Sequence, residues 1–217
     1  GKMMREQGVL QDPKVQKIFA LHVAGTMPMG TLASKEGTLL AGTSSIKILV
    51  KGNGGHAAAP HHTIDPVVTG SKIVVELQTL ISRELSPLES GVISITMANA
   101  GSATNVIPST MELQGTIRSL TSEGISKLQK RVKEVAESIA TANRCEAEVS
   151  FPGNDYPPTI NDAGCWELGK SAAKDILGQE KVSEMDSIMG GEDFAYFTEE
   201  IPGCFSFLGV GNPEIDA

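Results

Sequence analysis

The sequence has 217 residues with a formal net charge of −8, and 40% of its residues are hydrophobic and 20% charged. This composition is that of a soluble globular protein, long enough for one large domain or two small ones. The acidic balance and the lack of a Lys/Arg run exclude the basic face that nucleic acids and anionic membrane surfaces require. No apolar stretch approaches the roughly 20 residues needed to cross a bilayer, so we expect no membrane span.

The three cysteines are Cys145, Cys165 and Cys204, widely spaced and in no CxxC pattern. An odd number at such spacing argues against both a disulfide framework and a zinc knuckle. The first residues also lack the apolar core of a signal peptide. We therefore expect a reducing compartment, the cytoplasm or an organelle, without a signal that says which.

The amino-terminal segment combines a short helix and a strand. We expect the helix around Lys2 to Gln7 and a buried strand over Val15 to Val23, which carries His22 at its end. At the end of an apolar strand, a histidine is more often a hydrogen-bonded core residue than a metal ligand. Taken alone, His22 therefore leaves both interpretations open.

A regular pattern of strands and helices begins at residue 44. Alternating apolar residues from Ile46 to Val50 predict a strand with one face buried. Asp65 followed by Pro66 predicts the start of a helix that ends near Arg83. The later elements are, in order, the strands Val92 to Met97 and Met111 to Ser119, a helix from Thr121 or Ser122, and a strand that alternates from Glu146 to Phe151.

This order of strand, helix, strand, strand, helix and strand is that of the ferredoxin-like fold, a four-stranded antiparallel sheet with two helices on one face. We predict such an α+β (βαββαβ) domain over residues 44–151. It is inserted into an α/β domain formed by residues 1–43 and 152–217, with a linker at Pro152 to Pro158 and a helix from Asn161. Neither flank is long enough to close a doubly wound sheet, so we expect the α/β domain to be incomplete and truncated before its end.

Three histidines follow one glycine-rich stretch. Gly52 to Gly55 lead into His56, and His61 and His62 come shortly after it. Backbone can approach a ligand closely at such a loop, but a glycine-rich turn with surface histidines fits equally well. Adjacent His61 and His62 do not easily aim at one centre, and there is no HxH or HExxH spacing. We therefore expect no complete local metal site.

Two further groups could carry chemistry. Asn105 offers an amide, and Arg118 offers a guanidinium that matches a substrate carboxylate, although a solvated sheet edge fits both residues as well. Glu192 and Asp193 follow two glycines and suit either a metal site or the start of a helix. There is no GxSxG, no Walker loop and no GxGxxG after a strand, which leaves serine hydrolases, nucleotide hydrolases and dinucleotide oxidoreductases without support.

These individually weak signals occur in the order found in one known family. The segments concerned are Leu21-His22-Val23, Gly52 to His56, His62 to Pro66, Leu77-Gln78, Ser82-Arg83-Glu84, Asn105 to Pro108, Gly115 to Arg118, Tyr156 to Ile160 and Gly191 to Phe194. On them, essentially the whole sequence resembles the zinc- or manganese-type aminoacylase and carboxypeptidase peptidases. It is most similar to their branch of indole-3-acetyl (IAA) amino acid hydrolases, hippurate hydrolases and N-acyl-amino-acid amidohydrolases.

The resemblance implies a two-metal catalytic domain, interrupted by a ferredoxin-like domain that serves as lid and dimer surface. It implies that His22 is a metal ligand and that Glu192 lies near the metal pair. His56 would be the catalytic residue that stabilises the oxyanion in a neighbouring active site. Asn105 and Arg118 would bind the carboxylate of the amino-acid part of the substrate.

The resemblance also implies two divalent ions, zinc or manganese, in full-length family members. The other ligands and the general-base glutamate of the family lie outside residues 1–217, and Gly191 stands where the family usually has serine. We therefore expect this chain alone to bind no metal and to show no activity.

The expected function is metal-dependent hydrolysis of the amide bond of N-acyl amino acids, as part of a full-length amidohydrolase that is a homodimer through the ferredoxin-like domain. The alternative is a catalytically inactive truncated homologue that acts as a structural or interaction subunit of a larger assembly. A third reading, an independent binding module for acylated amino acids, depends on Asn105 and Arg118 alone.

Overall fold

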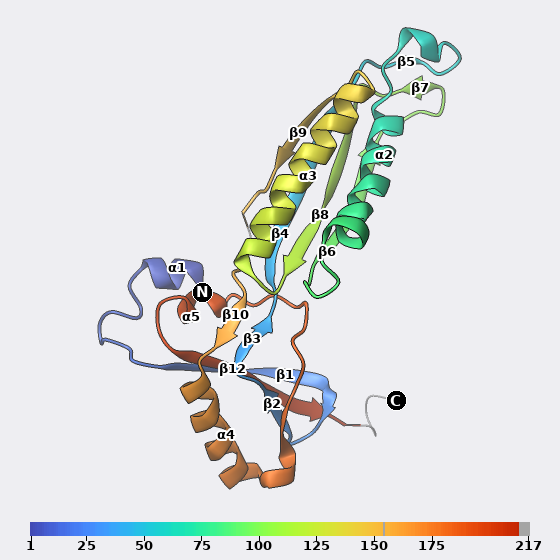
Figure 1. The fold of residues 1–217 in the computed structure, drawn as a ribbon. Helices are drawn as coiled ribbons and strands as arrows, with labels where there is room; N and C mark the ends of the chain where they lie inside the picture. The colour runs from blue at the N-terminus through green and yellow to red at the C-terminus, as the bar shows by residue number, and fades with distance from the viewer. Residues whose placement is uncertain (154, 213–217) are drawn as a thin grey trace. The chain divides into compact units, whose positions relative to one another are not determined.

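The computed structural model describes residues 1–153 and 155–212, which form two compact units (Figure 1). Unit 1 consists of Gly1–Gly42 and Tyr156–Ala217, and unit 2 is the continuous segment Thr43–Asp155. The boundaries predicted from the sequence lie at 43/44 and 151/152. In the described part of the chain, no helix is both long enough and apolar enough to cross a membrane.

Unit 2 is built on a four-stranded sheet with the strand order β6-β8-β4-β9. Its strands are β4 (Gly42–Lys51), β6 (Val92–Ala100), β8 (Thr110–Ser119) and β9 (Glu146–Ser150). β6 pairs antiparallel with β8, and β4 pairs antiparallel with β9. A second, two-stranded sheet joins β5 (Gly55–His56) to β7 (Val106–Ile107).

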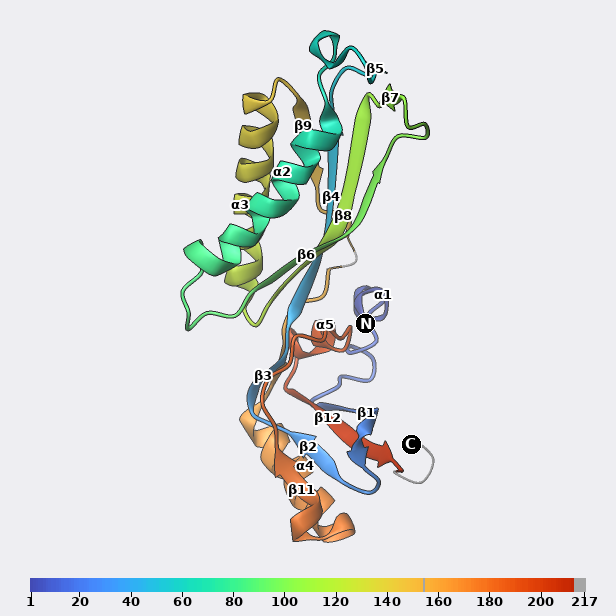
Figure 2. The same ribbon diagram turned by 90° about the vertical axis from the view of Figure 1, so that its right-hand side faces the viewer.

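Two helices, α2 (Pro66–Thr79) and α3 (Ser122–Ala142), cover one face of the larger sheet (Figure 2). Both begin where the sequence predicts. The Asp65 side chain accepts hydrogen bonds from two backbone N–H groups of the first turn of α2, and Thr121 accepts one at the start of α3. These caps satisfy donors that a helix start leaves unpaired. A π-helix, Leu80–Glu84, continues α2 to the predicted end.

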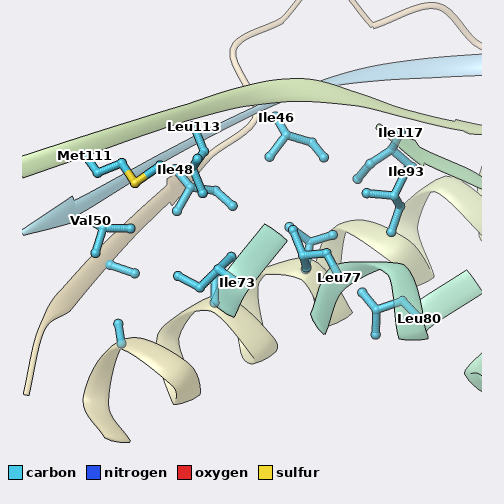
Figure 3. Close-up of a cluster of buried hydrophobic side chains, with 14 of the residues drawn as sticks. Ile46, Ile48, Val50, Ile73, Leu77, Leu80, Ile93, Met111, Leu113 and Ile117 are labelled. Carbon is cyan, nitrogen blue, oxygen red and sulfur yellow. The ribbon is translucent and has the colours of Figure 1, made fainter. Parts of the chain in front are cut away.

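The core of unit 2 lies between the sheet and its two helices (Figure 3). Each strand contributes one face and each helix one stripe. The members that are at most 2% exposed are Ile46, Ile48, Val50, Ile73, Leu77, Leu80, Leu113, Ile117, Leu128, Val132, Ala136 and Ala140. The opposite face of the sheet is polar, and there Lys47 forms an ion pair with Glu112 at 2.6 Å. Alternation along β8 places Arg118 on this polar face, since Ile117 and Ser119 on either side are buried.

The two ends of unit 2 lie together. The backbone N–H of Ser45, near the start of β4, donates to the carboxylate of Asp155 at 3.2 Å. β4 and β9 are also neighbours in the sheet. The chain therefore leaves unit 2 close to the place where it enters.

A bulge in β6 depends on Gly115 of β8. The register shifts between Ile95, which pairs with Gly115, and Met97. A Cβ atom at Gly115 would lie 2.0 Å from the carbonyl oxygen of Ser94. Because that oxygen is backbone, β6 and β8 must separate to admit any side chain. We expect Gly115→Ala to lower the unfolding free energy of unit 2 by about 1–3 kcal/mol, measured by native-state amide exchange in β6 and β8.

Gly25 provides the matched control for this prediction. A Cβ atom at Gly25 would meet nothing within 4 Å, and this glycine does not have a positive φ. Gly25→Ala should therefore leave the exchange rates of β6 and β8 unchanged. Equal protection of these amides in both variants would contradict the packing argument.

Unit 1 contains a mixed sheet with the strand order β1-β12-β2-β11. Its strands are β1 (Ile18–Pro28), β2 (Leu32–Ser34), β11 (Val182–Glu184) and β12 (Gly203–Gly211), and β3 (Gly37–Leu40) pairs antiparallel with β10 (Thr159–Asn161) beside it. β1 runs parallel to β12, which runs antiparallel to β2. The helices are α1 (Lys2–Glu6), α4 (Ala163–Leu177), α5 (Ala195–Thr198) and the 3-10 turn Gln179–Lys181.

The predicted buried strand over Val15 to Val23 is wrong in extent and in burial. β1 begins at Ile18, and Phe19, Leu21 and Val23 are 47%, 63% and 60% exposed. These three residues alternate along β1 and share one face of the sheet, which the described residues leave largely uncovered. An apolar run alone cannot tell a strand that is covered on both faces from one that is not.

The cysteines pack as small apolar side chains. All three are buried and free of disulfides. Burial raises the pKa of the Cys165 and Cys204 thiols, which keeps them protonated and unreactive at neutral pH. Cys165 and Cys204 belong to the cluster in which Trp166 of α4 packs on the sheet of unit 1.

Candidate functional site

His22 lies on β1 in register with Phe207 of β12. Its ring centroid lies 5.8 Å from that of Phe207 and 6.2 Å from that of Phe205. Its Nδ1 atom lies 2.8 Å from the carbonyl oxygen of Val23. Because a carbonyl oxygen can only accept, the neutral ring carries its proton on Nδ1 and keeps the lone pair of Nε2. The imidazole is therefore held in the tautomer of a metal ligand.

Glu192 lies in the loop between β11 and α5, on the same aromatic support as His22. Phe194, two residues further on, packs on Phe205 with a centroid distance of 5.7 Å. Phe205 thus contacts both His22 and the residue that anchors the Glu192 loop. The acidic pair also precedes a helix, but α5 has only four residues. The interpretation of the pair as a helix start is thus confirmed, and its place near a metal site stays a prediction.

The residues that the structure describes do not complete a metal site. Throughout residues 1–153 and 155–212, no three His, Cys, Asp or Glu side chains gather closely enough to hold a metal ion. His22 contacts Phe205, and Phe194, two residues after Glu192, contacts the same ring. A full ligand set needs groups beyond these.

His56 lies on the two-stranded sheet of unit 2, paired with Val106. The backbone N–H of Ala58 donates to its Nδ1 atom at 3.1 Å. The proton of the neutral ring is therefore on Nε2, and the exposed edge of the ring presents a donor. This tautomer is opposite to that of His22. It suits donation to a developing negative charge rather than metal ligation.

Asn105 is held beside His56 by the backbone. The N–H of Ala57 donates to the carbonyl oxygen of Asn105 at 3.0 Å. The glycines before His56 permit this arrangement: a Cβ atom at Gly54 would lie 2.5 Å from the carbonyl oxygen of Ile107. The glycine-rich stretch thus reflects close backbone packing, which brings His56 and Asn105 to the same end of unit 2.

His61 and His62 form a separate surface feature. They lie on the 3-10 turn Pro60–His62, with ring centroids 4.0 Å apart. Their rings contact each other, and neither residue belongs to a metal-binding group in the part of the chain that the structure describes.

Arg118 lies at the opposite end of unit 2 from Asn105. It is the penultimate residue of β8 and pairs with Val92, the first residue of β6. Asn105 precedes β7, close to the start of β8 at Thr110. Thr110 and Arg118 are eight residues apart in one strand, which at about 3.3 Å per residue is roughly 26 Å. One chain therefore does not bring Asn105 and Arg118 to the same carboxylate.

The aromatic support of His22 was missed by sequence reasoning. Periodicity gives no register between parallel strands that lie far apart in the chain. The alternation of Phe205 and Phe207 marks one apolar face of β12. Nothing in the pattern pairs this face with His22.

By sequence and by fold, the chain is similar to hydrolases and deacetylases. It is 45% identical over 212 residues to IAA-amino acid hydrolase ILR1-like 2 of Arabidopsis thaliana, covering 96% of this chain and 47% of that protein. It is 35% identical over 218 residues to N-acetyldiaminopimelate deacetylase of Leuconostoc citreum, covering 98% and 55%. YXEP of Bacillus subtilis, a structure described as a dinuclear metal binding peptidase from the M20 family, matches with a TM-score of 0.77 and 31% identity, covering 96% of this chain and 51% of that one.

The sequence profile described as Peptidase family M20/M25/M40 matches residues 1–217. The chain belongs to this family, and the resemblance found in the sequence is confirmed. It spans about half the length of the curated relatives it matches.

Proposed function

We propose that this chain is part of a metal-dependent amidohydrolase that cleaves the amide bond of N-acyl amino acids, of the IAA-amino acid conjugate type. The observation that carries the proposal is the difference between the Nδ1 contacts of two histidines. Nδ1 of His22 lies against the carbonyl oxygen of Val23, whereas Nδ1 of His56 accepts from the N–H of Ala58. In the neutral rings, Nε2 therefore carries a lone pair in His22 and an N–H group in His56. Hydrolysis of an amide on a metal needs both a ligand and an oxyanion donor. The names of the Arabidopsis and Leuconostoc relatives support an acylated amino acid as substrate.

Each site residue has one role in this proposal. His22 is a ligand to one of two divalent ions, zinc or manganese, and Glu192 lies near them. When bound, the metal pair polarises the scissile carbonyl and lowers the pKa of a water molecule. The Nε2–H group of His56 donates to the oxyanion, where one such donor contributes about 10²–10³ in kcat. Asn105 and Arg118 hold the substrate carboxylate.

In the same proposal, unit 1 is part of the α/β catalytic domain, and unit 2 is a ferredoxin-like lid and dimerisation domain. The strand order β6-β8-β4-β9 supports this assignment of unit 2. So does the single core between its sheet and two helices. This arrangement is the one expected of βαββαβ connectivity.

A homodimer would bring Arg118 of one subunit close to Asn105 of the other. β6 is at the edge of its sheet, and over Val92–Ala100 it contains no charged residue and no proline. Residues 96–100 of this strand are exposed. Edge strands normally carry lysine, proline or another feature that prevents pairing. We infer that β6 pairs with β6 of a second copy.

Symmetry then determines which groups meet. In an antiparallel pair of β6 strands about a two-fold axis, the Val92 end of one strand lies beside the Ala100 end of the other. The Val92 end carries Arg118, and the Ala100 end leads to Asn105 and His56. The homodimer would therefore place Arg118 of one subunit near the partner's Asn105 and the partner's His56.

The substrate class can be tested in a chimera in which residues 1–217 replace the matching part of the Arabidopsis relative. IAA-alanine carries the carboxylate, and its methylamide lacks it. We expect Arg118→Gln to raise KM for IAA-alanine by about tenfold to a hundredfold, because a hydrogen bond to a charged group contributes roughly 1.5–3 kcal/mol. KM for the methylamide should stay unchanged.

Arg83→Gln, at an exposed arginine of the π-helix, is the matched control and should alter neither KM value. An equal loss on both substrates would show that Arg118 does not recognise the carboxylate. A chimera that dimerises and binds two metal ions, yet hydrolyses neither compound, would reject the proposed function.

A catalytically inactive structural subunit is the second candidate. It is favoured by the lack of a three-residue metal-binding group within residues 1–153 and 155–212. In that case unit 2 would supply a contact surface to a larger assembly through β6. Hydrolysis by the chimera that depends on His22 would reject this candidate.

A further inference from the structure

The buried side chain of Asn161 forms hydrogen bonds to the edge of β12 at Phe205, whose ring contacts that of His22. Asn161, the last residue of β10, is 3% exposed. Its Oδ1 atom accepts a hydrogen bond from the backbone N–H of Phe205 at 2.8 Å. Its Nδ2 atom donates to the carbonyl oxygen of Phe205 at 3.1 Å. The carboxamide thus engages both backbone groups of one residue, as a peptide unit of a neighbouring strand would.

This side chain stands where β12 lacks a strand neighbour. β2 pairs with Phe207 and Leu208 of β12 and, among the described residues, does not reach Phe205. Asn161 Nδ2 also lies 2.9 Å from Ser34 Oγ and 2.8 Å from the carbonyl oxygen of Lys35, so its two hydrogens are shared among three acceptors. Ser34 Oγ in turn donates to the carbonyl oxygen of Phe205 at 2.5 Å. These buried polar groups satisfy one another, so the backbone of Phe205 is tightly held.

Phe205 connects this polar network to the candidate site. Its ring contacts those of His22, Phe207 and Phe194, with centroid distances of 6.2, 5.4 and 5.7 Å. Phe194 is two residues beyond Glu192. A shift in the backbone of Phe205 would therefore move the surface on which the imidazole of His22 lies.

We propose that Asn161 is a positioning residue for His22. It fixes the backbone of Phe205, and the Phe205 ring then holds the imidazole so that Nδ1–H reaches Val23 and Nε2 stays available. The consequence for metal binding rests on the proposed function, in which His22 is a ligand. The positioning itself is a property of unit 1 and needs no metal.

The test is an NMR measurement of the His22 ring in the 217-residue chain, without metal and at a pH where imidazole is neutral. In the unmodified chain we expect ring-current shifts from Phe205 and Phe207 and the two ¹⁵N signals of an Nδ1–H tautomer. Asn161→Asp keeps an acceptor for the N–H of Phe205 but replaces the donating Nδ2 with oxygen. We expect its His22 signals to move to those of an unconstrained imidazole.

Three further variants make the result specific. Thr159→Val lies on the same strand, at a buried hydroxyl that makes no hydrogen bond, and should leave the His22 signals unchanged. Val182→Ala removes buried surface in the cluster around Trp166 and controls for loss of stability. Ser34→Ala removes only the serine bonds of the network, and should shift the His22 signals in the same direction by a smaller amount. Ser34→Ala therefore gives the answer if Asn161→Asp does not fold.

Unchanged His22 signals in Ser34→Ala and in folded Asn161→Asp would overturn the proposal, as would an equal change in Val182→Ala. Zinc binding to the chimera separates this inference from the proposed function. If both are right, Asn161→Asp weakens zinc binding by about tenfold to a hundredfold. If the His22 signals respond but even His22→Ala leaves zinc binding unchanged, the positioning stands and the proposed function fails.

Discussion

Two variants of the chimera that each have low activity at low substrate concentration, His56→Ala and Arg118→Ala, should regain activity when they are mixed and exchange subunits. Arg118 and His56 lie at opposite ends of unit 2. In the proposed homodimer, each site would therefore take one of them from each subunit. In a mixed dimer one site lacks both groups and the other has both. Random exchange should restore about a quarter of the unmodified activity, measured with IAA-alanine at low concentration.

The matched negative control is a mixture of His56→Ala and Asn105→Ala. These residues lie at the same end of unit 2, where Ala57 bonds to Asn105. Every site in a mixed dimer then lacks one of them, so no activity should return. A second control adds Ala98→Lys to both chains, which places a charged side chain on each edge strand β6 and should prevent dimers. Mixed dimers that form without regaining activity would contradict the shared site.

His22→Ala should have the largest effect on the chimera. The variant removes the only imidazole of unit 1, whose Nε2 atom is left available by the bond from Nδ1 to Val23. We expect fewer than two bound metal ions and a fall in kcat of about 10³-fold, since a metal contributes several kcal/mol to the transition state. Elemental analysis and kcat at saturating substrate measure the two effects.

His61→Ala is the control for His22→Ala, because His61 is an exposed histidine whose ring contacts only His62 among the described aromatic pairs. It should retain metal and activity. Full metal content and unchanged kcat in His22→Ala would remove His22 from the site. Comparable losses in both variants would indicate a general effect of losing an imidazole.

The elements of unit 2 were predictable because their signals are local. Alternation from Ile46 to Val50 is enough to define the buried face of β4. The caps at Asp65 and Thr121 are hydrogen bonds between near neighbours in the sequence. Each of these features depends on residues close together in the sequence, so contacts between distant segments had little influence on them.

The errors and omissions concern relations between distant segments. The burial of β1 depends on what covers it, and the register of His22 against Phe207 depends on a strand near the other end of the chain. The network of Asn161 joins β10, β2 and β12 through single hydrogen bonds that leave no periodic trace in the sequence. The separation of Asn105 from Arg118 follows from the extended form of β8, yet the family resemblance assigns both to one carboxylate without saying which subunit supplies each.

The closeness of the two ends of unit 2 has a consequence for the order of folding. β3 must pair with β10 although the whole of unit 2 separates them in the chain. Before unit 2 has folded, closing so long a loop is entropically unfavourable; once it has folded, Ser45 and Asp155 are in contact and only short connections remain to be ordered. Folding of unit 2 therefore brings β3 and β10 close together before they pair, and we expect the sheet of unit 1 to form after unit 2.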